Sequence, residues 1–547
     1  MMRRLGLLTL SMAVALLVAA PVFAGDGPIV DAPAGQLQGS TEDGLNVFKG
    51  IPYAQPPIGK ARWRAPVPVG RWDGVKSAEI FGASCIQPKA SSGNIYAHDI
   101  GAISEDCLFL NIWAPKDAKN APVLFWIHGG AFTTGSGSEM LYNGERLASR
   151  GVVVVSINYR LGVLGWLAHP GLSAESPLKI SGNYGLLDQV QALMWVRKNI
   201  AAFGGDPANV TICGESSGGL NVVYLMVSPA ARGLFAKAIA QSAYMVSMPD
   251  LKKKVYGTPA AEGVGQWISM KAQAADIFAL RGMDGETLSK IAARAGFIPL
   301  GNVDGVLLRK QLVDTFDAGE QAKVPVIAGF NSGEIRSLTI LAPKPPATAE
   351  EYETTIRAKY GDLADAFLKL YPSANMQESI YANTRDALYG WTAERLAKDQ
   401  AKLGVPSYLY LFDHGYPAAD NAGLHAFHAS ELPYIFGTYD RTTEHWPAIP
   451  ATPEEAAFSA QMMDYWTSFA RSGKPVAKNA PDWPAYGTNA AYMDFGATPE
   501  PKDHVYPGMF TLHEAEVCRR RADGGIPWTW NTGLAAPGTP AKPANCN

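Results

Sequence analysis

The chain has 547 residues, of which 47% are hydrophobic and 18% are charged, and its net charge at pH 7 is −3. This composition excludes an intrinsically disordered chain, which combines low hydrophobicity with high net charge. The near balance of basic and acidic residues disfavours a general nucleic-acid binder, because there is no basic excess to neutralise phosphate charges.

The first residues have the pattern of a secretory signal peptide, residues 1–24. Arg3 and Arg4 precede an almost wholly apolar run, and small residues suit cleavage after Ala24. The run is short for a bilayer span, which argues against a membrane anchor. We therefore expect a secreted or periplasmic protein with no membrane attachment after cleavage, and one domain over residues 25–547.

Export makes disulfides possible, and the chain has five cysteines. Cys213 ends an apolar, strand-like run, so we expect it to be a buried free thiol. The local pairs are then Cys85–Cys107 and Cys518–Cys546, although the sequence leaves open whether the second pair is bridged. Because no CxxC or HxxxH spacing occurs, we expect no metal site.

The middle of the chain alternates strand-like runs with helical patterns. Continuous apolar runs are typical of strands buried in a parallel sheet. The expected strands are residues 123–127, 152–157, 210–213, 236–240, 324–328 and 408–412. Helices are expected over residues 187–203, which Gly204 ends, and over residues 220–227. The alternation predicts an α/β protein with a mostly parallel, doubly wound sheet, to which residues 245–323 and 335–400 add helical covers.

A Gly-x-Ser-x-Gly motif, GESSG, occupies residues 214–218, between an expected strand and an expected helix. In that context the motif predicts a nucleophile elbow, with Ser216 in a strained backbone conformation and its hydroxyl exposed. The helix that follows directs its N-terminal dipole at the negative charge that develops during the reaction. The alternative is a glycine-rich turn with a surface serine, which the flanking strand and helix disfavour.

A serine hydroxyl needs a base, and on such a fold the acid and the histidine follow the serine in the chain. His428 lies after the last expected strand, and His425 is its near competitor. Glu334 follows the expected strand at residues 324–328, at the carboxyl end where α/β sites are built. There it would orient the imidazole and stabilise its charged form. The alternative for Glu334 is a solvated loop carboxylate.

The segment HGGA, residues 128–131, directly follows the expected strand at residues 123–127. A Gly-Gly turn can point backbone N–H groups at one spot. Together with the N–H of Ser217 they would form an oxyanion hole, in which each donor contributes about 3 kcal/mol in the transition state. A plain glycine-rich turn is the alternative, and His128 itself we interpret as structural.

These features resemble the type-B carboxylesterase family, which includes the cholinesterases. The resemblance extends from about residue 28 to about residue 483. Further motifs similar to those of the family occur, in chain order, at residues 48–54 (FKGIPYA), 104–113 (SEDCLFLNIW), 183–189 (NYGLLDQ) and 431–437 (ELPYIFG).

The resemblance implies the family's α/β-hydrolase fold. The residues that it implies are the triad Ser216, Glu334 and His428, the oxyanion donors Gly130, Ala131 and Ser217, the disulfide Cys85–Cys107, and the ion pair Arg62–Glu105. It selects His428 over His425, because the family's histidine stands three residues before the glutamate at Glu431. It also marks three departures, one of which is that Ser-Gly-Glu-Ile follows Asn331 where Asp-Glu-Gly is common in the family. Ser217 stands where the family usually has alanine, and Tyr96 lies near the place of the cholinesterases' choline-binding tryptophan, so a cholinesterase proper is not expected.

We therefore expect an exported serine carboxylesterase that hydrolyses small-molecule esters through an acyl-enzyme at Ser216. No cofactor and no nucleic-acid partner are expected. One alternative is a non-catalytic, cholinesterase-like binding or adhesion module, although such proteins usually lack the nucleophile or the histidine. Another is a lipase, amidase or thioesterase, since the same triad serves each of these reactions. The physiological substrate and the oligomeric state stay open.

Overall fold

The computed structural model describes residues 27–89 and 93–546. The expected signal peptide lies outside these residues. The strands are β1 Ile29–Ala32, β2 Gly35–Gln38, β3 Ser40–Glu42, β4 Leu45–Pro52, β5 Val75–Ser77, β6 Ser84–Cys85, β7 Ile103–Ser104, β8 Phe109–Pro115, β9 Ala121–Ile127, β10 Val153–Ile157, β11 Gly205–Glu215, β12 Lys237–Gln241, β13 Val326–Asn331, β14 Ser407–Phe412, β15 Ala491–Phe495 and β16 Pro499–Asp503.

The helices are α1 Glu145–Ala148, α2 Gly162–Trp166, α3 Pro170–Glu175, α4 Tyr184–Asn199, α5 Ser217–Val227, α6 Ala261–Lys271, α7 Ile277–Gly282, α8 Gly285–Arg294, α9 Leu312–Asp317, α10 Ala349–Tyr360, α11 Ala364–Leu370, α12 Met376–Arg385, α13 Trp391–Lys402, α14 Pro417–Asn421, α15 Leu432–Phe436, α16 Pro453–Ser472 and α17 Met509–Asp523. None of these helices, in the part of the chain that the structure describes, is long and apolar enough to cross a bilayer.

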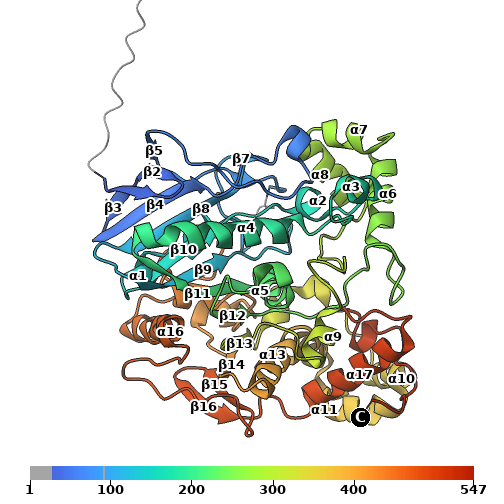
Figure 1. The fold of residues 1–547 in the computed structure, drawn as a ribbon. Helices are drawn as coiled ribbons and strands as arrows, with labels where there is room; N and C mark the ends of the chain where they lie inside the picture. Colours follow the sequence, from blue (N-terminus) through green and yellow to red (C-terminus); the bar gives the residue numbers. More distant parts are fainter. Residues whose placement is uncertain (1–26, 90–92, 547) are drawn as a thin grey trace, which may run out of the picture.

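A large sheet organises the molecule (Figure 1). Within the described residues it has eleven strands, in the order β16-β15-β14-β13-β12-β11-β9-β10-β8-β4-β3. The strands from β15 to β10 in that order run parallel to their neighbours, and antiparallel strands lie at both edges. The six strands expected from the apolar runs are β9 to β14, so the prediction of a mostly parallel sheet is confirmed.

Alternate residues of the central strands pack into two cores, one on each face of the sheet. In β9, Val123 and Phe125 belong to one core, and Leu124 and Trp126 belong to the other. Helices α4, α5 and α13 contribute to the first core, and helices α1 and α16 contribute to the second. Figure 1 shows α4 and α5 in front of the sheet. The sheet is therefore doubly wound, as predicted.

The long helix before the nucleophile motif begins earlier than expected. Helix α4 starts at Tyr184, directly after Asn183, whose φ of +53° turns the chain into the helix. The helix passes into a 3₁₀ turn that ends at Phe203, and Gly204 follows with φ +81°. This left-handed conformation favours glycine, so Gly204 ends the helix as predicted.

The two segments expected to be helical contain α6 to α9 and α10 to α13. Helix α13 packs against β13 and β14 and so covers the sheet. Helices α6 to α8 and α10 and α11 instead gather to one side of the sheet, at the right of Figure 1. The expectation that both segments cover the faces of the sheet is therefore only partly correct.

Both expected disulfides, Cys85–Cys107 and Cys518–Cys546, are formed, and Cys213 is a buried free thiol. The implied ion pair is also present, since Arg62 Nε donates to Glu105 Oε2 at 2.7 Å. These predictions are confirmed.

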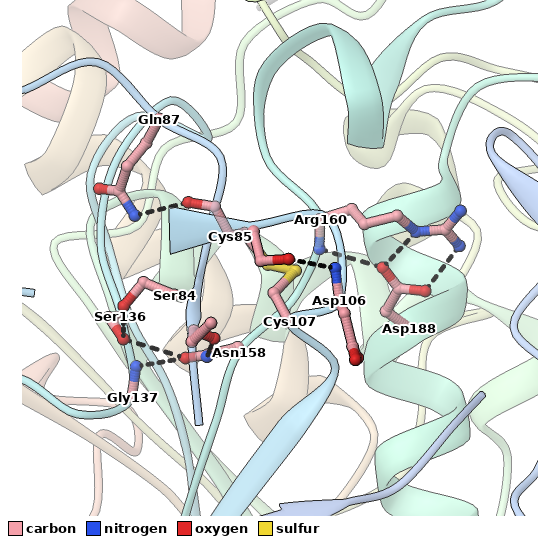
Figure 2. Close-up of a disulfide and its surroundings, with 12 residues drawn as sticks. Ser84, Cys85, Gln87, Asp106, Cys107, Ser136, Gly137, Asn158, Arg160 and Asp188 are labelled. Carbon is pink, nitrogen blue, oxygen red and sulfur yellow. Dashed lines mark hydrogen bonds and ion pairs between the residues drawn. A yellow bond between two sulfur atoms is a disulfide. The ribbon is translucent and has the colours of Figure 1, made fainter. Parts of the chain in front are cut away.

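The Cys85–Cys107 bridge lies beside the chain that follows the HGGA turn (Figure 2). The backbone N–H of Gly135 donates to Gln87 Oε1 at 2.9 Å. The N–H of Gly137 donates to Asn158 Oδ1 at 2.8 Å. The disulfide loop therefore helps to fix the segment after β9, on which the expected oxyanion donors lie.

Candidate active site

Ser216 lies in the sharp turn between β11 and α5, at the carboxyl end of a central strand. Its φ of +57° and ψ of −123° are a strained combination for a residue with a side chain. The glycines of the motif are required by close packing. A Cβ on Gly214 would lie 2.5 Å from the carbonyl oxygen of Gly218, and one on Gly218 would lie 2.1 Å from that of Ile127. The turn thus has the geometry of a nucleophile elbow.

Glu334 and His428 lie on different loops and meet in the interior. Glu334 opens a 3₁₀ turn directly after β13 and is fully buried. Its Oε2 is hydrogen-bonded to His428 Nδ1, and its Oε1 accepts from the backbone N–H of Asn331 at 2.9 Å. Glu334 is therefore not a solvated loop carboxylate, and the expected acid and histidine are brought together.

The loop that carries His428 is held by hydrogen bonds to its backbone. The Tyr96 hydroxyl donates to the His428 carbonyl at 2.8 Å. Asn331 Nδ2 donates to the Phe427 carbonyl at 2.7 Å. The resemblance placed Tyr96 near the position of the cholinesterases' choline-binding tryptophan and did not indicate this contact. Its contribution is to fix the main chain that presents the imidazole.

His425, the competing histidine, has other partners. Its Nδ1 lies 2.7 Å from Asp420 Oδ1, and its Nε2 lies 3.2 Å from Asp413 Oδ1. The hydrogen bond to Asp413 raises the pKa of His425 to about 9, with Asp420 adding to the effect against partial burial. Both ring nitrogens of His425 therefore lie against aspartates, whereas the ring of His428 lies against Glu334.

Glu215 is a residue in contact with this pair that the sequence reasoning missed. Its Oε1 lies 3.0 Å from His428 Nε2, the nitrogen expected to face Ser216. The hydrogen bonds of the described residues do not include one between Ser216 Oγ and the imidazole. The signal was present in the sequence, because a carboxylate at the end of an otherwise apolar buried strand is unusual.

The pKa values of Glu215 and His428 are both raised. Burial raises the pKa of Glu215 to about 8, although the nearby imidazole opposes this change. Burial disfavours the charged form of His428, but the carboxyl groups of Glu215 and Glu334 outweigh it and raise the pKa of His428 to about 9. Because the two groups lie in contact, their protonation steps belong to the pair.

Glu431 is another buried carboxylate near this pair. Its Oε2 accepts from Asn331 Nδ2 at 2.7 Å, and its Oε1 accepts from Gln241 Nε2 at 3.0 Å. Burial raises its pKa to about 6, against the bond from Asn331. The Gln241 carbonyl also accepts the N–H of Ser216 at 3.0 Å. Glu431 therefore links the elbow to the loops of the acid and the histidine.

The turn after β9 lies directly beside the elbow. A Cβ on Gly129 would lie 3.2 Å from Ser216 Cβ. The next residues have positive φ values in succession, +101° at Gly130, +54° at Ala131 and +57° at Phe132. Such a run of left-handed residues turns successive backbone N–H groups toward one side of the chain.

The three expected oxyanion donors are available to a ligand. In the described part of the chain, the backbone N–H groups of Gly130 and Ala131 donate no hydrogen bond. Ser217 is the first residue of α5, so its N–H has no partner within the helix. Among the described residues, no group of three or more His, Cys, Asp or Glu side chains could hold a metal ion.

Comparisons with known proteins identify the family. The profile of the Carboxylesterase family matches residues 26–510. The chain is 36% identical to the fumonisin B1 esterase of Sphingopyxis macrogoltabida over 484 residues, which cover 85% of each chain. It is also 36% identical to the para-nitrobenzyl esterase of Bacillus subtilis (strain 168) over 472 residues, which cover 84% of this chain and 92% of that one.

Solved structures are similar as well. A carboxylesterase of Geobacillus stearothermophilus superposes with a TM-score of 0.76 and 35% identity, covering 88% of this chain and 99% of that one. The fold is therefore the α/β-hydrolase fold, as expected. The chain belongs to the carboxylesterase family, and it is a carboxylic ester hydrolase. The alternative of a non-catalytic binding module is set aside.

Proposed function

We propose that this esterase works through a triad of Ser216, Glu334 and His428 and hydrolyses its substrate through an acyl-enzyme at Ser216. The observation that carries the proposal is the buried hydrogen bond between Glu334 and His428. The strained turn that presents Ser216, at the end of β11 in the same sheet, supports it further.

In the first step, His428 Nε2 takes the proton from Ser216 Oγ as the oxygen attacks the ester carbonyl carbon. Before this transfer, Nε2 exchanges its contact with Glu215 for one with Ser216, and such catalytic hydrogen bonds tighten when substrate binds. Glu334 holds the Nδ1 proton and stabilises the imidazolium that forms. His428 next gives its proton to the leaving alkoxide, and water releases the acid by the same steps in reverse.

The negative charge on the carbonyl oxygen is stabilised by the backbone N–H groups of Gly130, Ala131 and Ser217. These donors are fixed before the reaction begins, so their alignment costs nothing in the transition state. Each such donor contributes about 3 kcal/mol to transition-state stabilisation.

The location and the domain organisation are part of the same proposal. The N-terminal pattern of residues 1–24 supports export, with cleavage after Ala24. The two disulfides suit an oxidising compartment. Residues 25–547 then form the mature enzyme as one domain, and its substrates are small-molecule esters.

The direct test is turnover of p-nitrophenyl acetate and butyrate by Ser216→Ala. The proposal predicts a fall in kcat of roughly 10⁴-fold to 10⁶-fold. Ser472→Ala, which removes an exposed hydroxyl at the end of α16, is the control and should match the wild type. Turnover by Ser216→Ala at the wild-type rate would refute the proposed nucleophile. Rates on long-chain emulsions, anilides and thioesters then distinguish an esterase from a lipase, amidase or thioesterase.

A further inference from the structure

The oxyanion turn is a strained piece of backbone. Ala131 and Phe132 both have positive φ values, a conformation that residues with side chains rarely adopt. Such a turn keeps its shape only where the surrounding structure fixes its peptide groups. The peptide before Ala131 is fixed locally, because the Gly130 carbonyl accepts from the N–H groups of Thr133 and Thr134, each at 2.9 Å.

The peptide after Ala131 is held both from within the turn and from outside it. Within the turn, its carbonyl accepts from Thr133 Oγ1 at 3.1 Å. The backbone N–H of Phe132 donates to Ser217 Oγ at 3.2 Å, and both groups are buried. The Phe132 carbonyl accepts from the N–H of Gly162 at 2.7 Å. The Ser217 side chain is therefore the group outside the turn that holds the peptide after Ala131, and it helps to keep the backbone conformation of the residue whose N–H is an oxyanion donor.

The Ser217 hydroxyl also belongs to a buried polar chain behind the turn. The Tyr159 hydroxyl is close enough to the Ser217 hydroxyl for the two to interact. The same hydroxyl donates to the His128 carbonyl at 2.9 Å. The rings of Tyr159 and His128 are stacked, with centroids 4.5 Å apart. His128 is thus structural, as expected, and Ser217 connects to the turn at both His128 and Phe132.

We propose that the Ser217 hydroxyl is a positioning group for the oxyanion hole. This inference rests on the proposed function. Ser217 acts twice, because its N–H is one donor of the hole, while its Oγ sets the orientation of the turn that carries the other two. The hydroxyl thereby fixes the distance between the Ser217 N–H at the start of α5 and the N–H groups of Gly130 and Ala131 on the turn after β9.

Removing the hydroxyl has a specific consequence. In Ser217→Ala the N–H of Phe132 is buried without a partner, which favours arrangements of the turn that satisfy it elsewhere. The Ala131 N–H then points away from the position of the oxyanion. Because the donors act on charge that exists only in the transition state, kcat falls while substrate binding is retained.

The test compares wild type with Ser217→Ala on a p-nitrophenyl ester and on a trifluoromethyl ketone inhibitor, whose adduct places an oxyanion in the hole. We expect kcat to fall by about tenfold with KM nearly unchanged, and the inhibitor affinity to fall by the same factor as kcat/KM. The acidic limb of the pH profile should stay in place, because His428 keeps its partners. Ser217→Thr retains the hydroxyl and should recover part of the loss.

Ser228→Ala is the matched control, since it removes another fully buried hydroxyl, directly after the same helix α5, that has no partner in the turn. It should keep the wild-type kcat and inhibitor affinity. Wild-type values in Ser217→Ala, or an equal loss in Ser228→Ala, would overturn the inference. Neither result affects the proposed nucleophile, which Ser216→Ala tests separately.

Discussion

The contact between Glu215 and His428 makes a prediction about pH dependence. We consider Glu215→Gln, which keeps the shape of the side chain and removes its charge. An anionic carboxylate 3.0 Å from Nε2 stabilises the charged imidazolium, as does Glu334 on the other side of the ring. Without Glu215, the imidazolium loses one of these two partners and releases its proton at lower pH.

The expected size of this effect follows from the geometry. An opposite charge in direct contact shifts a pKa by about 1 to 3 units. Glu334 remains in the variant, so we expect the pKa of His428 to fall from about 9 by roughly 1 to 2 units, each worth about 1.4 kcal/mol. The neutral base is then available at lower pH, and the acidic limb of kcat/KM moves in that direction.

The assay is the pH profile of kcat/KM on a p-nitrophenyl ester, from about pH 5 to about pH 10, a range that includes the titration of the free enzyme's base. Glu444→Gln is the control, because it removes an exposed carboxylate from the segment after α15. Its profile should coincide with that of the wild type. An acidic limb that stays in place in Glu215→Gln, or moves to higher pH, would refute the electrostatic reasoning.

Other substitutions test the remaining parts of the site. Glu334→Gln removes the charge that stabilises the imidazolium, so kcat should fall by roughly 10³-fold or more, and near-normal turnover would reject Glu334 as the acid. Gly130→Ala would place a Cβ 2.3 Å from the Thr134 carbonyl oxygen, at a residue whose φ is +101°. The turn must therefore move, and kcat should fall by about 10²-fold. An unchanged kcat would show that this turn is not part of the oxyanion hole. Replacing Cys85 and Cys107 together by serine should lower the free energy of unfolding by about 3 kcal/mol, measured by chemical denaturation, and an unchanged midpoint would show that the bridge does not stabilise the fold.

The sheet and the nucleophile turn could be predicted because their signals are local. Each buried parallel strand is a continuous apolar run, as in residues 123–127. The glycines around Ser216 are required by contacts within the motif and with the neighbouring strand β9. The helical segments were recognised for the same reason. The places where these helices pack could not be predicted, because the sequence of residues 245–323 does not indicate which part of the sheet they contact.

The pairing of the site residues depends on contacts between distant parts of the chain. Local sequence does not distinguish His425 from His428, and only their partners, two aspartates for His425 and Glu334 for His428, separate them. The resemblance to a family supplied that choice. The contact of Glu215 with the imidazole and the bond from Phe132 to Ser217 were not predicted, because they arise only when the loops converge.

The central claim is that Ser216 is the nucleophile, and covalent labelling tests it most directly. The purified enzyme is treated with an organophosphate, and the site and extent of labelling are measured by mass spectrometry of its peptides. We predict one phosphoryl group per chain, on the Ser216 hydroxyl, with loss of esterase activity in proportion to labelling. Inactivation with the label on another residue, or full activity after complete labelling of Ser216, would contradict the account.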